Sequence, residues 1–144
     1  MNLPGLRLAS AAVAVVGLGI SIYLTIVHYS GGSPVCAIAE GCVTVQKSRY
    51  AEVAGAPVAL LGIVAYAGIL LSLVRDSEAA RAAAALLALG GVAFSAWLTY
   101  AEVALIDAIC IWCVGSAVCM TVLAGLSAAR FIAAPPEAAL NARP

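Results

Sequence analysis

The stretch LASAAVAVVGLGISIYLTIV, which runs from Leu8 to Val27, contains no charged side chain. A helix of about 20 apolar residues is long enough to cross the roughly 30 Å hydrocarbon core of a bilayer. Arg7 precedes the stretch, as a basic residue precedes the apolar core of a signal peptide, but such a core usually has only about 7 to 15 residues. We therefore predict a membrane-spanning helix over residues 8–27.

Three further apolar stretches of about this length lie at residues 57–74, 82–101 and 110–132. The composition agrees with them, because 65% of the residues are hydrophobic and 10% are charged, whereas soluble domains are about half apolar and about a quarter charged. We therefore predict an all-α integral membrane protein, a four-transmembrane-helix bundle that forms one domain over residues 1–132. We expect a flexible cytoplasmic tail at residues 133–144.

The basic residues predict the orientation of the bundle. If the four stretches span the membrane, the long loop at residues 28–56 and the short connection at residues 102–109 emerge on the same side. Five basic residues lie on the opposite side and two lie in the long loop: Arg7, Arg75, Arg81, Arg130 and Arg143 against Lys47 and Arg49. Because the more basic side of a membrane protein faces the cytoplasm, we expect cytoplasmic termini and an outward-facing loop.

The charge balance argues against binding to nucleic acid. Seven basic and seven acidic side chains cancel, whereas proteins that bind nucleic acid carry a basic patch. We therefore expect membrane lipid to surround the chain and any water-soluble partner to be another polypeptide.

Four of the five cysteines fall into two pairs at the outer face. Cys36 and Cys42 lie in the long loop among glycines, and Cys110 and Cys113 begin the last helix as the motif CIWC. Residues three apart share a helical face, and the free N–H groups of a first helical turn stabilise a thiolate. A mobile pair and an anchored pair on one side indicate an electron relay from an aqueous thiol to an acceptor in the bilayer, for which a quinone is suited.

Other interpretations of the cysteines remain open. The two pairs could be structural disulfides in a non-enzymatic membrane protein. They could also bind zinc, although zinc-ligand pairs usually have two to four intervening residues and the loop pair has five; we predict no metal. Cys119 lies deeper in the last helix, where a cysteine commonly acts as a small buried hydrophobe.

The order of three motifs resembles the bacterial branch of the vitamin K epoxide reductase family. These are CAIAEGCV at residues 36–43, SRYAEVAGAP at residues 48–57 and CIWC at residues 110–113, with Gly62 and Tyr66 between the last two. The resemblance covers about residues 21–119. It implies a four-helix bundle around a quinone, with the outer loop capping the pocket, in the bacterial cytoplasmic (inner) membrane.

The resemblance also implies roles for the cysteines. Cys36 and Cys42 would accept electrons from a thioredoxin-fold thiol oxidase, expected on a separate chain. Cys42 would then bond transiently to Cys110, and Cys113 would lie next to the quinone, so that the protein supports disulfide formation outside the cytoplasm. We expect the quinone to be bound by Ser48, Tyr66 and Trp112.

Two departures concern the polar residues of the pocket. Animal members of the family carry a tyrosine where this chain has Ala117 and an asparagine where it has Val58, which weakens the case for epoxide reduction. Reduction of a quinone consumes two protons, and Glu102 and Asp107 flank the outer end of the third stretch near Cys110. Each is either part of a proton relay or a solvated charge at the membrane surface.

Overall fold

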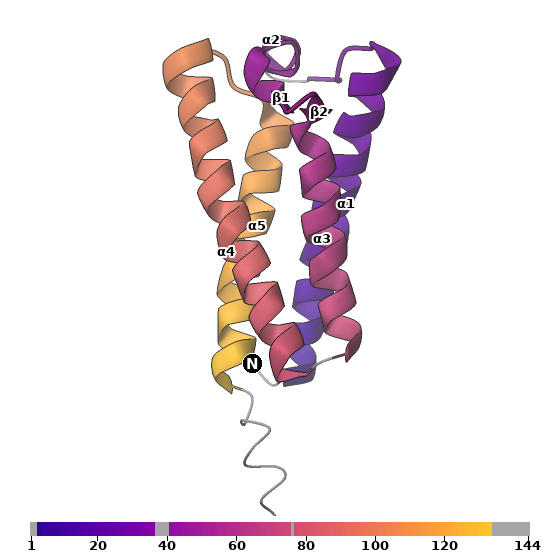
Figure 1. The fold of residues 1–144 in the computed structure, drawn as a ribbon, viewed down its shortest axis with the longest axis vertical. Helices are drawn as coiled ribbons and strands as arrows, with labels where there is room; N and C mark the ends of the chain where they lie inside the picture. The colour runs from indigo at the N-terminus through magenta and orange to yellow at the C-terminus, as the bar shows by residue number, and fades with distance from the viewer. Residues whose placement is uncertain (1–2, 37–40, 76, 134–144) are drawn as a thin grey trace, which may run out of the picture.

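The fold is dominated by four long helices that stand side by side (Figure 1). The computed structural model describes residues 3–36, 41–75 and 77–133. In these residues, four helical segments are long and apolar enough to cross a membrane, which confirms the predicted four-helix membrane bundle. The four long helices are α1 (Leu3–Ser30), α3 (Val58–Arg75), α4 (Glu78–Tyr100) and α5 (Ile111–Ala133).

Short elements cover one end of the bundle and form what we call the cap, residues 41–57. The cap consists of α2 (Gly41–Gln46), the 3₁₀ turn η1 (Arg49–Ala51) and the strands β1 (Glu52–Val53) and β2 (Ala56–Pro57). The two strands pair antiparallel. Ala54 and Gly55 join them with φ angles of 53° and 81°, the left-handed backbone that a two-residue hairpin turn requires. The cap lies at the end where α5 begins (Figure 1).

The third spanning helix is longer at both ends than its predicted limits of residues 82–101. It begins at Glu78 because the hydroxyl of Ser77 accepts a hydrogen bond from the N–H of Ala80 (3.2 Å) and caps the first turn. At the other end it continues as one wide π-helical turn, η2 (Ala101–Ile106), instead of the predicted connection. The helix stops where Asp107 adopts a left-handed φ of 53°.

The other predicted helix limits differ less from the structure. The first helix is extended from residues 8–27 to Leu3–Ser30, because residues 3–7 and 28–30, on either side of the apolar stretch, continue the helical turns. The second and fourth differ from the predicted 57–74 and 110–132 by one residue at each end. Most of the tail predicted at residues 133–144 lies outside the described residues.

The buried core lies between all four helices. It contains the fully buried Tyr66 and Ile69 of α3, with Ala14, Ala88, Met120 and Leu123 around them. The hydroxyl of Tyr66 donates to the carbonyl of Ser116 on α5 (2.9 Å). Where lipid removes the hydrophobic drive between helices, such a polar contact and close packing of small residues hold them together.

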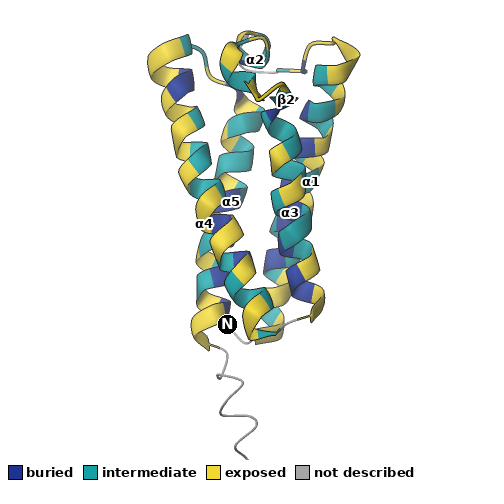
Figure 2. Cartoon of the chain, in the orientation of Figure 1, coloured by how far each residue is buried: buried dark blue, intermediate teal, exposed yellow. Residues whose placement is uncertain are grey.

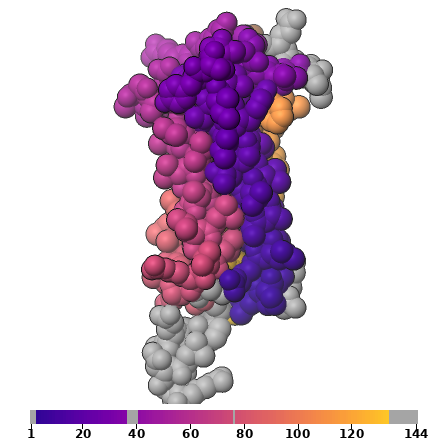
Figure 3. Space-filling view, turned by 90° about the vertical axis from the view of Figure 1, so that its right-hand side faces the viewer, coloured from indigo at the N-terminus to yellow at the C-terminus, as the bar shows by residue number. Residues whose placement is uncertain are grey.

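Small residues allow α1 and α3 to lie close together along their length (Figure 3). A Cβ atom added to Gly17 of α1 would collide with the ring of Tyr66. A side chain on Gly62 would similarly meet the hydroxyl of Ser21. Exposed residues follow the outer faces of the four helices (Figure 2), and the large apolar ones among them, such as Leu8 and Val74, suit contact with lipid.

Gly17→Ala is expected to destabilise the bundle by about 1–3 kcal/mol, because the new methyl group overpacks the contact with Tyr66. Gly19→Ala is the matched control, since nothing lies within 4 Å of a Cβ atom there and alanine favours a helix over glycine. Thermal unfolding of both variants in detergent measures the difference. Equal unfolding temperatures would show that the Gly17–Tyr66 contact does not hold α1 against α3.

Candidate active site

The cysteine pairs from the two halves of the chain meet where the cap rests on the start of α5. Cys36 and Cys42 form a disulfide. Cys42 and Cys110 are both fully buried in one cluster, and Cys36 and Cys113 pack against it. The structure thus brings together the four cysteines that the sequence predicts to act together, with the loop pair oxidised and Cys110 and Cys113 as thiols.

The contact between the cap and the segment before α5 requires a glycine. A Cβ atom on Gly41 would lie 2.5 Å from the carbonyl oxygen and 2.8 Å from the nitrogen of Ile109. Backbone atoms of this kind cannot move aside as a flexible side chain can. Because position 41 has no side chain, the first turn of α2 rests directly on the residue before Cys110, and Cys42 follows within the same turn.

Glu102 connects the π-helical turn to the two thiols of the CIWC motif. Its side chain is only 4% exposed, and its carboxylate accepts a hydrogen bond from the N–H of Cys110 (3.0 Å). The thiol of Cys113 has hydrogen-bonding contacts with both the Glu102 carboxylate and the Cys110 sulfur. Asp107, the other acidic residue noted in the sequence, is exposed.

The environment of Cys110 favours its thiolate. The hydrogen bond from the Cys113 thiol lowers the pKa of the Cys110 thiol to about 7, although burial and the charge of Glu102 oppose this shift. The Cys110 thiol is therefore deprotonated more readily than an ordinary cysteine. Since the thiolate is the nucleophile in disulfide exchange, Cys110 is suited to attack a disulfide packed against it.

Trp112 holds the loop that carries Cys36. Its indole N–H donates to the carbonyl of Val35, and the N–H of Val35 donates to the hydroxyl of Tyr23 on α1, both at 2.9 Å. The rings of Tyr23 and Trp112 also touch, with centroids 4.9 Å apart. Both the N–H and the carbonyl of Val35, the residue directly before Cys36, are therefore hydrogen-bonded to side chains of the helices.

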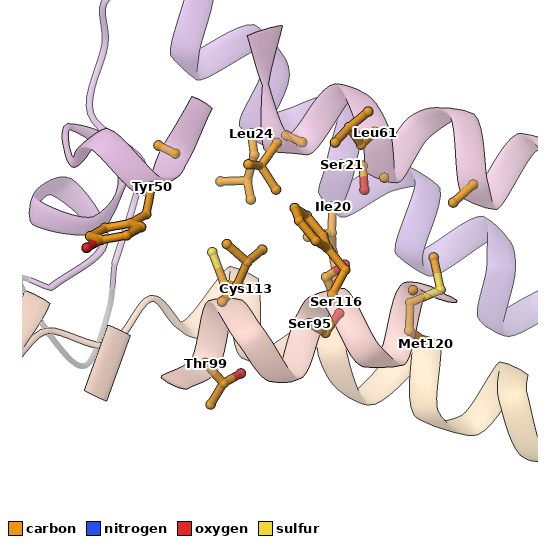
Figure 4. Close-up of a pocket in the computed structure, with 18 of the residues that line it drawn as sticks. Ile20, Ser21, Leu24, Tyr50, Leu61, Ser95, Thr99, Cys113, Ser116 and Met120 are labelled. Carbon is orange, nitrogen blue, oxygen red and sulfur yellow. The ribbon is translucent and has the colours of Figure 1, made fainter. Parts of the chain in front are cut away.

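A cavity of about 360 Å³ lies between the helices beneath the cap. It runs from Tyr50 at the cap, past Cys113, towards Met120 deeper in the bundle (Figure 4). Most of its walls are apolar, and Ser95, Thr99 and other polar side chains contribute a few hydroxyl groups. Mostly apolar walls with a few polar groups are typical of a small-molecule site.

The residues predicted to bind a quinone lie beside this cavity and are not among those that line it. Ser48 donates its hydroxyl to the carbonyl of Val45 (2.7 Å) and borders a second, more polar hollow next to His28. Tyr66 is buried in the core and bonded to Ser116, and Trp112 holds the loop. Their contact with a quinone remains a prediction.

Sequence reasoning missed most of the cavity wall. The pattern that reveals it is helical spacing: on α4 and η2 the polar residues Ser95, Thr99 and Glu102 recur at intervals of four and three, and on α5 Ser116 follows Cys113 by three. Such residues share one face of a helix. The residues missed include Tyr50, Phe94, Ser95, Thr99, Ser116 and Met120.

Trp112→Phe is expected to loosen the loop, because the bond to the Val35 carbonyl is lost. Loss of one hydrogen bond costs about 1 kcal/mol, which corresponds to about fivefold faster reduction of the Cys36–Cys42 disulfide by dithiothreitol. Trp97→Phe, on the exposed side of α4, is the matched control. An unchanged rate in Trp112→Phe would contradict this role of the indole.

The alkylation rate of Cys110 in the reduced protein is expected to rise with pH and to level off above about pH 7, because the thiolate is the species that reacts. Cys113→Ala removes the hydrogen bond that favours the thiolate and should move the midpoint to higher pH. Cys113→Ser keeps a donor and should move it less. Mass spectrometry of the labelled peptide measures both, and identical midpoints in all three proteins would contradict the assigned cause.

Comparison with protein families agrees with this geometry. Residues 8–128 match the family model described as the vitamin K epoxide reductase family. No individual curated protein matches the chain closely enough to count as a relative. Since the matched residues make up well over half of the chain, this multi-pass membrane protein belongs to the vitamin K epoxide reductase family and is a thiol oxidoreductase.

Proposed function

We propose that this protein is a thiol–quinone oxidoreductase that supports disulfide formation outside the cytoplasm. Electrons would pass from a thioredoxin-fold thiol oxidase on a separate chain to Cys36 and Cys42, then to Cys110 and Cys113, and finally to a quinone. The observation that carries the proposal is the cluster in which Cys42 packs against Cys110 while Cys113 borders the cavity.

Each transfer between sulfur atoms is a thiol–disulfide exchange, in which one disulfide forms as another is reduced. The dithiol of the partner becomes a disulfide as it reduces Cys36–Cys42 to two thiols. The Cys42 thiolate then attacks the Cys110 sulfur of an oxidised Cys110–Cys113 pair, and Cys113 leaves as a thiolate. Attack of Cys36 on Cys42 restores the loop disulfide and releases Cys110.

The arrangement of a loop disulfide beside two thiols corresponds to the end of this exchange. The inner pair then has to be reoxidised. When Cys110 and Cys113 form a disulfide, they give up two electrons and two protons, which a quinone takes up to become a quinol. The thiols thereby return to the oxidised state from which the next exchange begins.

The cavity fits such an acceptor. Its apolar walls suit a quinone ring and the start of an isoprenoid chain, and Cys113 is the cysteine that lines it. The hydroxyl groups of Ser95 and Thr99 are available to hold the carbonyl oxygens, whereas the Ser116 hydroxyl is already bonded to the Tyr66 hydroxyl (3.0 Å). The sequence departure at Ala117 therefore does not leave the site without hydrogen-bond donors.

The distribution of basic residues supports a bundle in the bacterial cytoplasmic membrane with both termini in the cytoplasm. In this orientation the cap and the Cys36–Cys42 disulfide face outward, where disulfides persist and a soluble partner can reach them. The proposed domain comprises residues 1–132.

The Cys113→Ala variant is expected to accumulate a disulfide between Cys42 and Cys110. With Cys113 absent, the Cys110 thiolate can attack Cys42 and release Cys36, and Cys110 has no partner of its own with which to form a disulfide. The product is then resolved only by the return of Cys36, which is prevented when the free Cys36 thiol is blocked. Blocking of free thiols followed by mass spectrometry of the cross-linked peptides measures it. Cys119→Ala is the control and should show no such linkage.

Absence of the mixed disulfide in Cys113→Ala would contradict the relay. A loop disulfide that only staples the outer face would stay between Cys36 and Cys42 in both variants.

A further inference from the structure

Glu102 is a buried carboxylate in a segment long and apolar enough to span the membrane. A charged side chain at membrane depth is costly, and those that persist usually have a partner or a function. Glu102 is the only charged side chain among the described residues that line the cavity, so no basic group there neutralises it. Its polar contacts are with the N–H of Cys110 and the thiol of Cys113.

The backbone role of this residue does not require an acid. The Glu102 carbonyl accepts hydrogen bonds from the N–H groups of Asp107 and Ala108, which closes the π-helical turn, and any residue could provide that carbonyl. The N–H of Cys110 needs only an acceptor, which an amide side chain also supplies. What an amide cannot do is take a proton from the thiol of Cys113.

We propose that Glu102 is the proton acceptor for Cys113 when the inner cysteine pair is oxidised. The proton moves from the Cys113 sulfur to the Glu102 carboxylate, which leaves a thiolate on Cys113 and a neutral carboxyl group on Glu102. This proposal rests on the proposed function, because the proton that Glu102 accepts is one of the two that Cys110 and Cys113 lose when they become a disulfide. The other is the proton that Cys110 gives up when its thiol becomes the thiolate.

The position of Glu102 suits both receipt and delivery of the proton. Its carboxylate contacts the Cys113 thiol on one side and borders the cavity on the other. A proton held there remains in the cavity where the reduced acceptor needs it, and it does not have to cross apolar walls from water. Among the described residues that line the cavity, the titratable side chains besides Glu102 and Cys113 come down to Tyr50. Cys110 contacts Glu102 through its N–H, and the cysteines of the loop disulfide do not titrate.

Glu102→Gln should lower quinone-dependent turnover about 100-fold, the size expected when a general base is lost. The amide keeps an acceptor for the Cys110 N–H, so a purely structural role predicts nearly full activity in this variant. Asp107→Asn is the matched control, because that carboxylate is exposed and asparagine tolerates the same left-handed backbone. Turnover of Glu102→Gln equal to that of Asp107→Asn would overturn the proposal.

A second readout needs neither quinone nor partner. In a Cys110→Ser, Cys119→Ser background, Cys113 is the one thiol outside the loop disulfide. If Glu102 accepts the proton of Cys113, the thiolate forms by transfer within the pair and not by loss of a proton to water. The rate of Cys113 alkylation should then change less than threefold between pH 6.5 and 8.5. With Glu102→Gln added, the rate should rise about tenfold per pH unit.

Parallel pH profiles in the two proteins would overturn the role of Glu102. This outcome is distinct from failure of the relay itself, because the Cys42–Cys110 linkage in Cys113→Ala forms without proton transfer to Glu102. If the Cys42–Cys110 disulfide forms in Cys113→Ala while the pH profiles of Cys113 alkylation are parallel, the proposal about Glu102 is rejected and the relay is not.

Discussion

The site depends on one close contact, between the first turn of α2 and the backbone just before α5. Gly41 lies so near Ile109 that no side chain fits between them. This contact brings Cys42 into the same buried cluster as Cys110. Irregular backbone is not tolerated against lipid, so such a junction has to lie at an end of the bundle, beneath the cap.

The contact divides the site into two environments. On the cap side, the backbone before Cys36 is held by two side-chain hydrogen bonds, to Tyr23 and to Trp112. On the bundle side, Cys113 borders an apolar cavity and shares a hydrogen-bonded group with Glu102. The proposed thiol exchange would take place at the junction between the cap and the helix bundle.

The sequence predicts the four helices because each apolar stretch is long enough to span a membrane. It does not predict that Ser77 starts the third helix before its charged residues, nor that the helix passes Tyr100 as a π-helical turn, because both depend on local hydrogen bonds. The cysteine pairs are visible from their spacing. Most of the cavity wall is not visible, because its apolar residues resemble those that face lipid, and only the spacing of Ser95, Thr99 and Glu102 marks the inward face of its helix. For the same reason the sequence does not show that Tyr66 lies in the core.

Anaerobic oxidation of the fully reduced protein by a water-soluble quinone tests the central claim most directly. If electrons pass from the loop pair through Cys110, the quinone converts both pairs to disulfides in the unchanged protein, while Cys36 and Cys42 stay reduced in Cys110→Ser. Oxidation of Cys36 and Cys42 at the same rate in both proteins would show that the loop pair reaches the quinone without the inner pair, and would contradict the account.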